Sequence, residues 1–233
     1  ADTLIDQRVA RVVCAMVDPD ACVSGGGVER LRDVGIDVEV GTLAAEAERL
    51  NAAYLTHRHT GRPYVSLKWA QSLDGTIATT TGDSKWITGK QARARAHALR
   101  AEAQAVVVGV DTVVADNPAL TVRHVSGEDP TPVILDSTCR TPPDAAAIRP
   151  GETIVATTVR SSKEDRGRLE AAGAEVLIVE ENDTGRPSIS RFLRALGERG
   201  LVHVLVEGGS RVAAGFLSSG CADRLVAFVA PRL

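Results

Sequence analysis

The chain has 233 residues, enough for one large domain or for one domain and part of another. Hydrophobic residues make up 44% and aromatic residues only 3%, which predicts a core built mainly from aliphatic side chains. The 27 Lys and Arg nearly balance the 30 Asp and Glu, and the net charge of −3 argues against non-specific binding to nucleic acids.

The sequence shows no sign of a membrane or an oxidising compartment. No apolar run approaches the roughly 18 residues that span a bilayer, and the first residues do not resemble a signal peptide, so we expect a cytoplasmic protein. No C-x-x-C pair is present, and the four cysteines lie in separate segments: Cys14, Cys22, Cys139 and Cys221. We expect buried free thiols, with a disulfide or a zinc site as the open alternative.

The first sixty residues predict a small α/β segment. A buried strand is expected at 9–17, a short helix at 28–34, a strand at 36–40 and an amphipathic helix at 43–58. The polar, Pro-containing run at 59–63 breaks the pattern, which indicates a domain boundary there. We therefore divide the chain into 1–60 and 61–233.

The remainder alternates strand and helix patterns. A strand is expected at 64–72, a helix at about 90–101 capped by Thr88, a strand at 104–108 and a short helix from Asp111. Further strands are expected at 132–136, 153–157, 175–179, 202–206 and 223–229, and helices at 163–172, 188–199 and 210–219. This order predicts an α/β fold with a mixed, mostly parallel sheet, whose ligands bind at the carboxyl ends of the strands.

One strand end carries a carboxylate and two glycines. The apolar run 202–206 leads into Glu207, Gly208, Gly209 and Ser210, where a helix begins. Glycines allow a cofactor to approach the backbone, and a helix amino terminus offers free N–H groups to a phosphate. A carboxylate there suits the N–H donors of a heterocycle. An ordinary strand-to-helix turn is the alternative, and this motif alone does not decide between them.

Three single residues are ambiguous by themselves. Arg123 follows a turn at 116–118, and a surface position explains it as well as a binding role does. Trp86 lies in a polar, Gly-flanked loop, where it can stack on a ring or cover the edge of the core. Lys68 lies in an alternating strand, either on the solvent face or against a ligand.

Several familiar signatures are missing from this stretch of sequence. A zinc deaminase needs H-x-E followed by P-C-x-x-C, and neither string occurs. The G-x-G-x-x-G dinucleotide fingerprint does not follow any predicted strand, and no G-x-S-x-G indicates a serine hydrolase. We therefore expect no metal in this chain.

Three strings together resemble one family. They are LKWAQSLDGTIATTTGDSKWITG, LRAEAQAVVVGVDTVVADNPALTVR and LVEGGSRVAAGFL. In this order and spacing they are similar to the bacterial riboflavin-biosynthesis bifunctional deaminase-reductases, whose reductase domain has a dihydrofolate-reductase-like fold. Residues 8–51 resemble the end of that family's cytidine-deaminase-like domain. The resemblance implies that 1–60 is a deaminase remnant whose zinc-binding part would precede residue 1, and that 61–233 is the reductase domain.

The resemblance also implies a reaction and its residues. NADPH would reduce the ribosyl group of 5-amino-6-(5-phosphoribosylamino)uracil, a phosphorylated pyrimidine, to a ribityl chain, in an enzyme expected to be a homodimer. Lys68 and Asp116 are the candidates for catalysis. The substrate would be bound by Ser84, Arg100, Leu120, Arg123 and Glu207, with both arginines on its phosphate. NADPH would contact Ala70, Trp86, Thr112, Asp116, Ser137 and the stretch from Gly209 and Ser210 to Gly215.

Two other functions stay open at this point. A dihydrofolate-reductase-like enzyme acting on another substrate would not need two arginines for a phosphate. A non-catalytic domain kept for assembly or ligand binding would not need the combination of Lys68, Ser84, Arg123 and Glu207.

Overall fold

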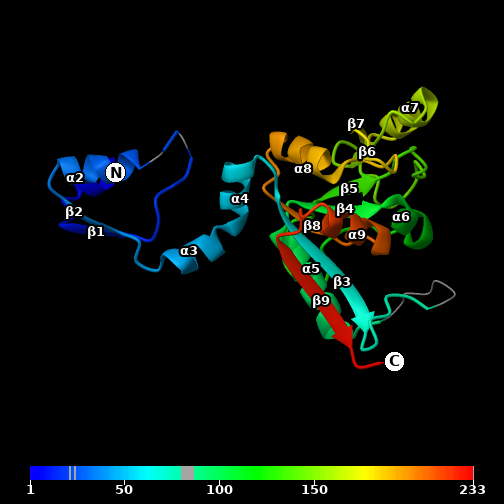
Figure 1. The fold of residues 1–233 in the computed structure, drawn as a ribbon, viewed down its shortest axis with the longest axis horizontal. Coiled ribbons are helices and arrows are strands. Elements are labelled where there is room, and N and C mark those ends of the chain that lie inside the picture. Colours follow the sequence, from blue (N-terminus) through cyan, green and yellow to red (C-terminus); the bar gives the residue numbers. More distant parts are fainter. Residues whose placement is uncertain (21, 24, 80–86, 233) are drawn as a thin grey trace. The chain divides into compact units, whose positions relative to one another are not determined.

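A computed structural model describes residues 1–20, 22–23, 25–79 and 87–232 (Figure 1). They divide into two compact units, Ala1–Gly61 and Arg62–Leu233. Within the described ranges, no helix combines the length and the apolarity that crossing a membrane requires.

The first unit contains two parallel strands and short helices. Its elements are α1 (Asp2–Asp6), β1 (Arg11–Cys14), α2 (Gly26–Asp33), β2 (Asp37–Val40), α3 (Ala44–Leu50) and α4 (Ala52–Thr60). The pairing of β1 with β2 starts at Arg11 and Asp37. Helix α1 was not predicted. The prediction that the first strand is buried is wrong, because β1 lies in a two-stranded sheet and Val13 is 53% exposed.

The single helix expected at 43–58 is two helices. Asn51 separates α3 from α4 with backbone angles of φ −99° and ψ 12°, outside the helical region. Its side-chain amide donates a hydrogen bond to the carbonyl of Ala47 at 2.8 Å. Asparagine competes with the helical hydrogen-bond pattern in this way, which explains the break.

The second unit is built around a seven-stranded sheet in the order β7-β6-β5-β4-β8-β3-β9. Every neighbouring pair in this sheet is parallel, so the expected mostly parallel α/β fold is confirmed. The strands are β3 (Tyr64–Ser72), β4 (Ala105–Gly109), β5 (Thr131–Leu135), β6 (Ile154–Thr157), β7 (Glu175–Ile178), β8 (His203–Val206) and β9 (Arg224–Ala230). The helices are α5 (Lys90–Glu102), α6 (Val110–Asp116), α7 (Lys163–Ala171), α8 (Ile189–Glu198) and α9 (Ser210–Ser218).

Helices cover both faces of this sheet. Val65 and Leu67 of β3 face one cluster of buried residues, which includes Phe192 of α8 and Phe216 of α9. The opposite face carries a second cluster, to which α5, α6 and α7 contribute through side chains such as Leu99. The core is largely aliphatic, as the composition predicted, and its two layers fix α5 and α9 on opposite sides of the sheet.

Two glycines allow α9 to approach the sheet closely. A Cβ atom added to Gly109 at the end of β4 would lie 2.8 Å from a methyl group of Val212, and one added to Gly208 would lie 2.5 Å from the Cβ of Val212. Close packing therefore accounts for Gly208, which was predicted to make room for a cofactor. At Gly209 the nearest atom to an added Cβ is the hydroxyl oxygen of Thr112 at 4.0 Å, so the space there is open.

We expect Gly208→Ala to destabilise the second unit by about 1–3 kcal/mol, the usual cost of overpacking. Gly209→Ala is the matched control, because its added methyl group meets no close neighbour. Urea denaturation of both variants measures the difference. Equal free energies of unfolding for the two variants would show that Val212 moves away without cost.

Two local expectations need correction. Helix α5 begins after Gly89 rather than after Thr88, and no side chain caps it; the carbonyl of Thr88 instead accepts a hydrogen bond from Arg93. All four cysteines are free thiols, but only Cys139 and Cys221 are buried, while Cys22 is exposed in a turn. The neighbouring apolar residue Val23 is also exposed, at the surface of the small first unit. An apolar neighbour therefore did not indicate that Cys22 is buried.

Candidate active site

The candidate site lies at the point in the sheet where the strand order reverses. The strands from β4 to β7 are added outward in sequence, and β8 then returns between β4 and β3. Ligands of open parallel sheets bind at the carboxyl ends of the strands beside such a switch point. Glu207 follows β8 directly. Lys68 is level with it on β3, because Leu67 pairs with Val206.

Glu207 forms a nearly buried ion pair with Arg100 of α5. Oε2 of the carboxylate accepts from Nη2 of Arg100 at 2.6 Å and from Nε at 3.2 Å. The side chains are only 8% and 14% exposed. Nη1 of Arg100 also donates to the carbonyl oxygen of Thr121 at 3.0 Å. The other carboxylate oxygen, Oε1, is buried and accepts no hydrogen bond from the described residues, so it can accept one from a ligand.

The segment 117–124 presents Arg123 beside this pair. Leu120 is 1% exposed and anchors the segment in the core. Leu120 and His124 have positive φ angles of 55° and 69°, a conformation that costs a non-glycine residue about 1–3 kcal/mol. The Arg123 side chain is exposed, and its guanidinium contacts no partner in the part of the chain that the structure describes. Arg123 therefore supplies an exposed cation from a segment whose backbone is bound by Arg100 at Thr121 and by His97 at Arg123.

His97, which sequence reasoning missed, connects this segment to α5. Its Nδ1 accepts a hydrogen bond from the backbone N–H of Arg123 at 3.0 Å, and its ring packs edge-on against His124 with 5.1 Å between ring centres. The residue is only 8% exposed. The available signal was its position three residues before Arg100, which places both side chains on one face of a helix.

Acid should destabilise the second unit through His97 and His203. The pKa of His97 is lowered from 6.5 by burial and by the positive charges of Arg100 and Arg123, and burial lowers that of His203. Near and below pH 6.5 the unfolded chain then binds more protons than the native chain. The free energy of unfolding therefore decreases as the pH is lowered, until the pH lies below the lowered pKa values of the native histidines. Thermal midpoints measured from pH 7.5 to pH 5 should show this decrease. His203→Gln should reduce the change of the midpoint with pH, whereas His59→Gln, at an exposed position, should not. Parallel slopes for all three proteins would contradict it.

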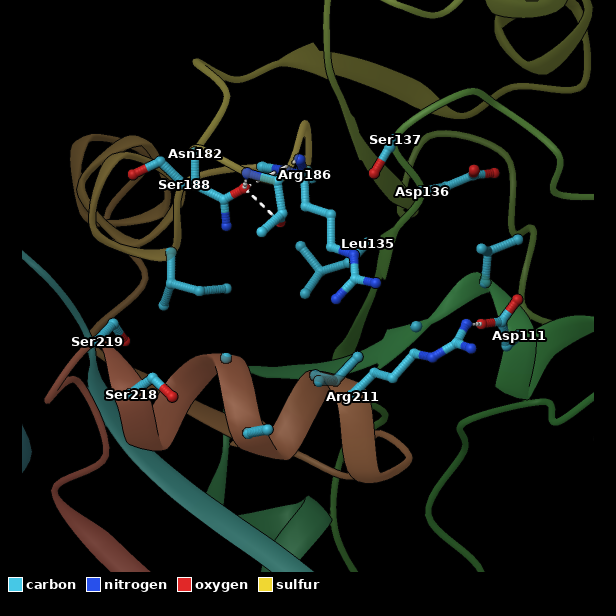
Figure 2. A pocket seen from close by; sticks show the side chains of 18 of the residues that line it. Asp111, Leu135, Asp136, Ser137, Asn182, Arg186, Ser188, Arg211, Ser218 and Ser219 are labelled. Carbon is cyan, nitrogen blue, oxygen red and sulfur yellow. Dashed lines mark hydrogen bonds and ion pairs between the residues drawn. The ribbon is translucent and has the colours of Figure 1, made fainter.

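A cavity of about 740 Å³ opens at the same end of the sheet, between α9 and the segments that follow β5 and β7 (Figure 2). The predicted cofactor residues Ser137 and Gly215 line it. Gly209 and Ser210 begin α9, and the open side of Gly209 faces Thr112 of α6. The first N–H groups of α9 have no side-chain cap, so they are available to an anion.

Three arginines line this cavity: Arg140, Arg186 and Arg211. Asp111 pairs with Arg140 at 2.7 Å and with Arg211 at 3.4 Å. The hydrogen bond from Arg140 holds the pKa of Asp111 below its usual value, and the charges of Arg140, Arg211 and Arg186 add to this effect. Figure 2 shows the Arg186 side chain extending into the pocket. Two carboxylates, Asp111 and the buried Asp136, line the cavity together with the three arginines, so arginines outnumber carboxylates in its lining.

The remaining predicted residues are placed as follows. Lys68 and Ala70 lie on β3, and the Lys68 ammonium is 5.6 Å from the centre of the Phe228 ring. Asp116 is exposed at the end of α6. Ser84 and Trp86 lie outside the described residues. The structure thus groups Arg100, Leu120, Arg123 and Glu207 on the α5 side of the sheet, and Ser137 and Gly215 around the cavity beside α9.

Metal ligands do not cluster in the described ranges. No group of three or more His, Cys, Asp or Glu side chains there could hold a metal ion.

Known proteins match this chain over its whole length. The model of the RibD C-terminal domain family matches residues 63–233. The riboflavin biosynthesis protein RibD of Aquifex aeolicus is 42% identical, and the match covers 100% of this chain and 64% of that protein. The chain thus spans less than two thirds of the length of this relative.

Solved structures give the same result. RibD of Acinetobacter baumannii superposes with a TM-score of 0.86 at 35% identity, covering 100% of this chain and 64% of the other. A diaminohydroxyphosphoribosylaminopyrimidine deaminase/5-amino-6-(5-phosphoribosylamino)uracil reductase from Thermotoga maritima superposes with a TM-score of 0.82 at 34% identity, covering 100% and 62%.

Proposed function

Because the chain belongs to the RibD C-terminal domain family, we propose that its second unit is a reductase of riboflavin biosynthesis with the dihydrofolate-reductase-like fold of that family. It reduces the ribosyl group of 5-amino-6-(5-phosphoribosylamino)uracil with NADPH. Residues 1–60, which lie in the first unit, are the end of a deaminase domain, as the match of this whole chain to 62% of a deaminase/reductase supports. We expect the enzyme to be a cytoplasmic homodimer.

The observation that carries this proposal is the buried carboxylate of Glu207 with one oxygen that lacks a partner among the described residues; Arg123 lies in the segment that Arg100 and His97 hold. A pyrimidine offers ring N–H donors to a carboxylate, and a phosphate accepts the forked donors of an arginine. Since Arg100 already binds Glu207 and Thr121, its role is to hold the Glu207 carboxylate in place. Arg123 is then the main phosphate ligand, with Leu120 as the floor of the substrate site.

The cavity beside α9 fits a nicotinamide dinucleotide. The uncapped amino terminus of α9 suits a pyrophosphate, and the open space at Gly209 leaves room for it. Ser137, Thr112, Gly209, Ser210 and Gly215 would contact the cofactor, which supplies the hydride when it is bound. The protein's part is to hold the substrate carbon at about 3–3.5 Å from the hydride donor.

Lys68 is the better candidate for handling the proton that accompanies the hydride. It is level with Glu207 in the sheet register, whereas Asp116 is exposed at the end of α6. The Lys68 ammonium lies 5.6 Å from the centre of the Phe228 ring on β9, a contact that restricts its side chain.

The test of this proposal is the oxidation of NADPH by the purified chain with 5-amino-6-(5-phosphoribosylamino)uracil, followed by its absorbance. Turnover would establish the activity. Binding of NADPH without turnover of this substrate would favour the dihydrofolate-reductase-like enzyme with another substrate. No binding of NADPH would favour a non-catalytic domain and contradict the proposal.

NADPH should be preferred over NADH because of Arg186. This arginine lines the cavity but has no ion-pair partner among the described residues, in contrast to Arg140 and Arg211. Arg186→Ala should raise the KM for NADPH, with a loss of about 1.5–3 kcal/mol for a charge-assisted hydrogen bond, and leave that for NADH unchanged. Arg194→Ala, on the exposed side of α8, is the control. An equal loss for both cofactors would rule out a contact to the extra phosphate.

A further inference from the structure

His97 is placed to control the segment that carries Arg123. Helix α5 and the segment 117–124 run side by side in opposite directions, because Arg100 binds the carbonyl of Thr121 and His97 binds the N–H of Arg123. The third contact comes from Asp129, whose Oδ1 accepts from the N–H of Val122 at 2.6 Å. Three side chains thus hold the backbone of three consecutive residues.

This segment needs such support. Leu120 and His124 both have positive φ angles, and strained conformations of this kind persist only where the surroundings impose them. The backbone groups of 121–123 bond to side chains, so regular secondary structure does not fix their path. The contact of His97 lies directly between Leu120 and His124, at the residue whose side chain is free.

The hydrogen bond also fixes the chemical state of His97. An imidazole nitrogen accepts a hydrogen bond only when it carries no proton, so Nδ1 is bare and the ring is neutral with its proton on Nε2. The charged and titratable groups around the ring are Arg100, Arg123, His124 and Glu207. Three of these four can carry positive charge, which favours the neutral ring that the hydrogen bond requires.

We propose that His97 is a positioning residue for substrate binding: through its bare Nδ1 it fixes the backbone of Arg123 and so aims the free guanidinium at the phosphate of the substrate. This inference rests on the proposed function, because it takes Arg123 to be the phosphate ligand. His97 itself contacts neither substrate nor cofactor in this scheme.

The test uses ribose 5-phosphate as the probe and ribose as its control, with dissociation constants measured by calorimetry on the whole chain. His97→Leu fills the same space with an apolar side chain but removes the acceptor, and should weaken binding roughly tenfold, as expected for a part-buried donor that loses its hydrogen-bond partner. His97→Gln restores an acceptor oxygen and should recover most of the affinity. His203→Gln changes a partly buried histidine at the opposite end of β8 and should leave the affinity unchanged.

Two further measurements separate positioning from a merely structural role. His97→Leu combined with Arg123→Ala should bind no more weakly than Arg123→Ala alone, because the two residues act through one contact. Nitrogen-15 NMR of the histidine rings should show His97 neutral and protonated on Nε2. A proton on Nδ1, an unchanged affinity in His97→Leu, or independent losses in the double variant would each overturn the proposal.

Failure of the proposed function gives a different result. If the unmodified chain binds ribose 5-phosphate but does not oxidise NADPH with the pyrimidine substrate, the reductase assignment fails. The affinities of the His97 variants for ribose 5-phosphate still test the role of His97 in that case. If it binds ribose 5-phosphate no better than ribose, the phosphate site at Arg123 is wrong and this inference is overturned with it.

Discussion

Replacing Arg100 by methionine is expected to lower the free energy of unfolding by about 3–5 kcal/mol, the cost of breaking a buried ion pair from one side. The reason is that Glu207 remains in a nearly buried position with its charge uncompensated. The carboxylate can escape this cost by taking up a proton, so the stability of the variant should recover as the pH is lowered. Urea denaturation at pH 5 and pH 8 measures both effects.

The double variant Arg100→Met, Glu207→Gln is the control for this prediction. With the charge removed from both partners, the penalty of an isolated buried charge disappears, and the double variant should be more stable than Arg100→Met alone. Arg95→Met serves as the surface comparison, because its ion pair with Glu102 is about half exposed on both sides and is worth about 0–1 kcal/mol. A similar loss for Arg95→Met and Arg100→Met would mean that the burial of the Glu207 pair has no energetic consequence.

Replacing Arg123 by alanine is expected to weaken binding of the phosphorylated pyrimidine by about 1.5–3 kcal/mol, which is the usual value of a hydrogen bond to a charged group. NADPH binding should be almost unaffected, because the residues that line the cavity proposed for the cofactor do not include Arg123. Since the Arg123 side chain is exposed and has no partner among the described residues, the fold should tolerate its removal. Equilibrium titration with each ligand separates the two outcomes.

Two comparisons sharpen the Arg123 experiment. Arg123→Lys keeps the charge without the planar fork of donors, and should recover only part of the affinity. The dephosphorylated form of the substrate should bind the wild type and Arg123→Ala equally well. Equal losses for substrate and NADPH in Arg123→Ala, or a loss that persists with the dephosphorylated substrate, would remove Arg123 from the phosphate site.

Strand and helix positions in the second unit could be predicted because its central strands are buried along most of their length. The continuous apolar runs that became β4 and β8 are covered on both faces, and parallel strands of this kind carry a strong sequence signal. The first unit was harder. Its strands are half exposed, and a single side chain, Asn51, ends a helix whose hydrophobic pattern continues beyond it.

The site could be predicted only in part, because its contacts join residues that are far apart in the chain. The motif at Glu207 indicated a binding carboxylate, but nothing in the spacing indicated that Arg100, 107 residues earlier, would bind it. Likewise, Gly208 is required by the packing of Val212 rather than by a ligand. His97 was missed because its spacing from Arg100 indicates only that both lie on one face of α5, and not that His97 accepts a hydrogen bond from the backbone of Arg123.

The late return of β8 into the middle of the sheet has a consequence for how the protein folds. Strand β3 is joined to β4 only through β8, which lies more than 130 residues after β3 in the chain. Contacts of such long sequence separation form slowly, because a large loop must close before they are gained. The same strand leads into Glu207, so the carboxylate meets Arg100 in the step that unites the two parts of the sheet. A partly folded chain that still lacks β8 therefore has neither a continuous sheet nor the pair of Glu207 and Arg100, and recovery of binding at the proposed substrate site should report directly on the insertion of β8.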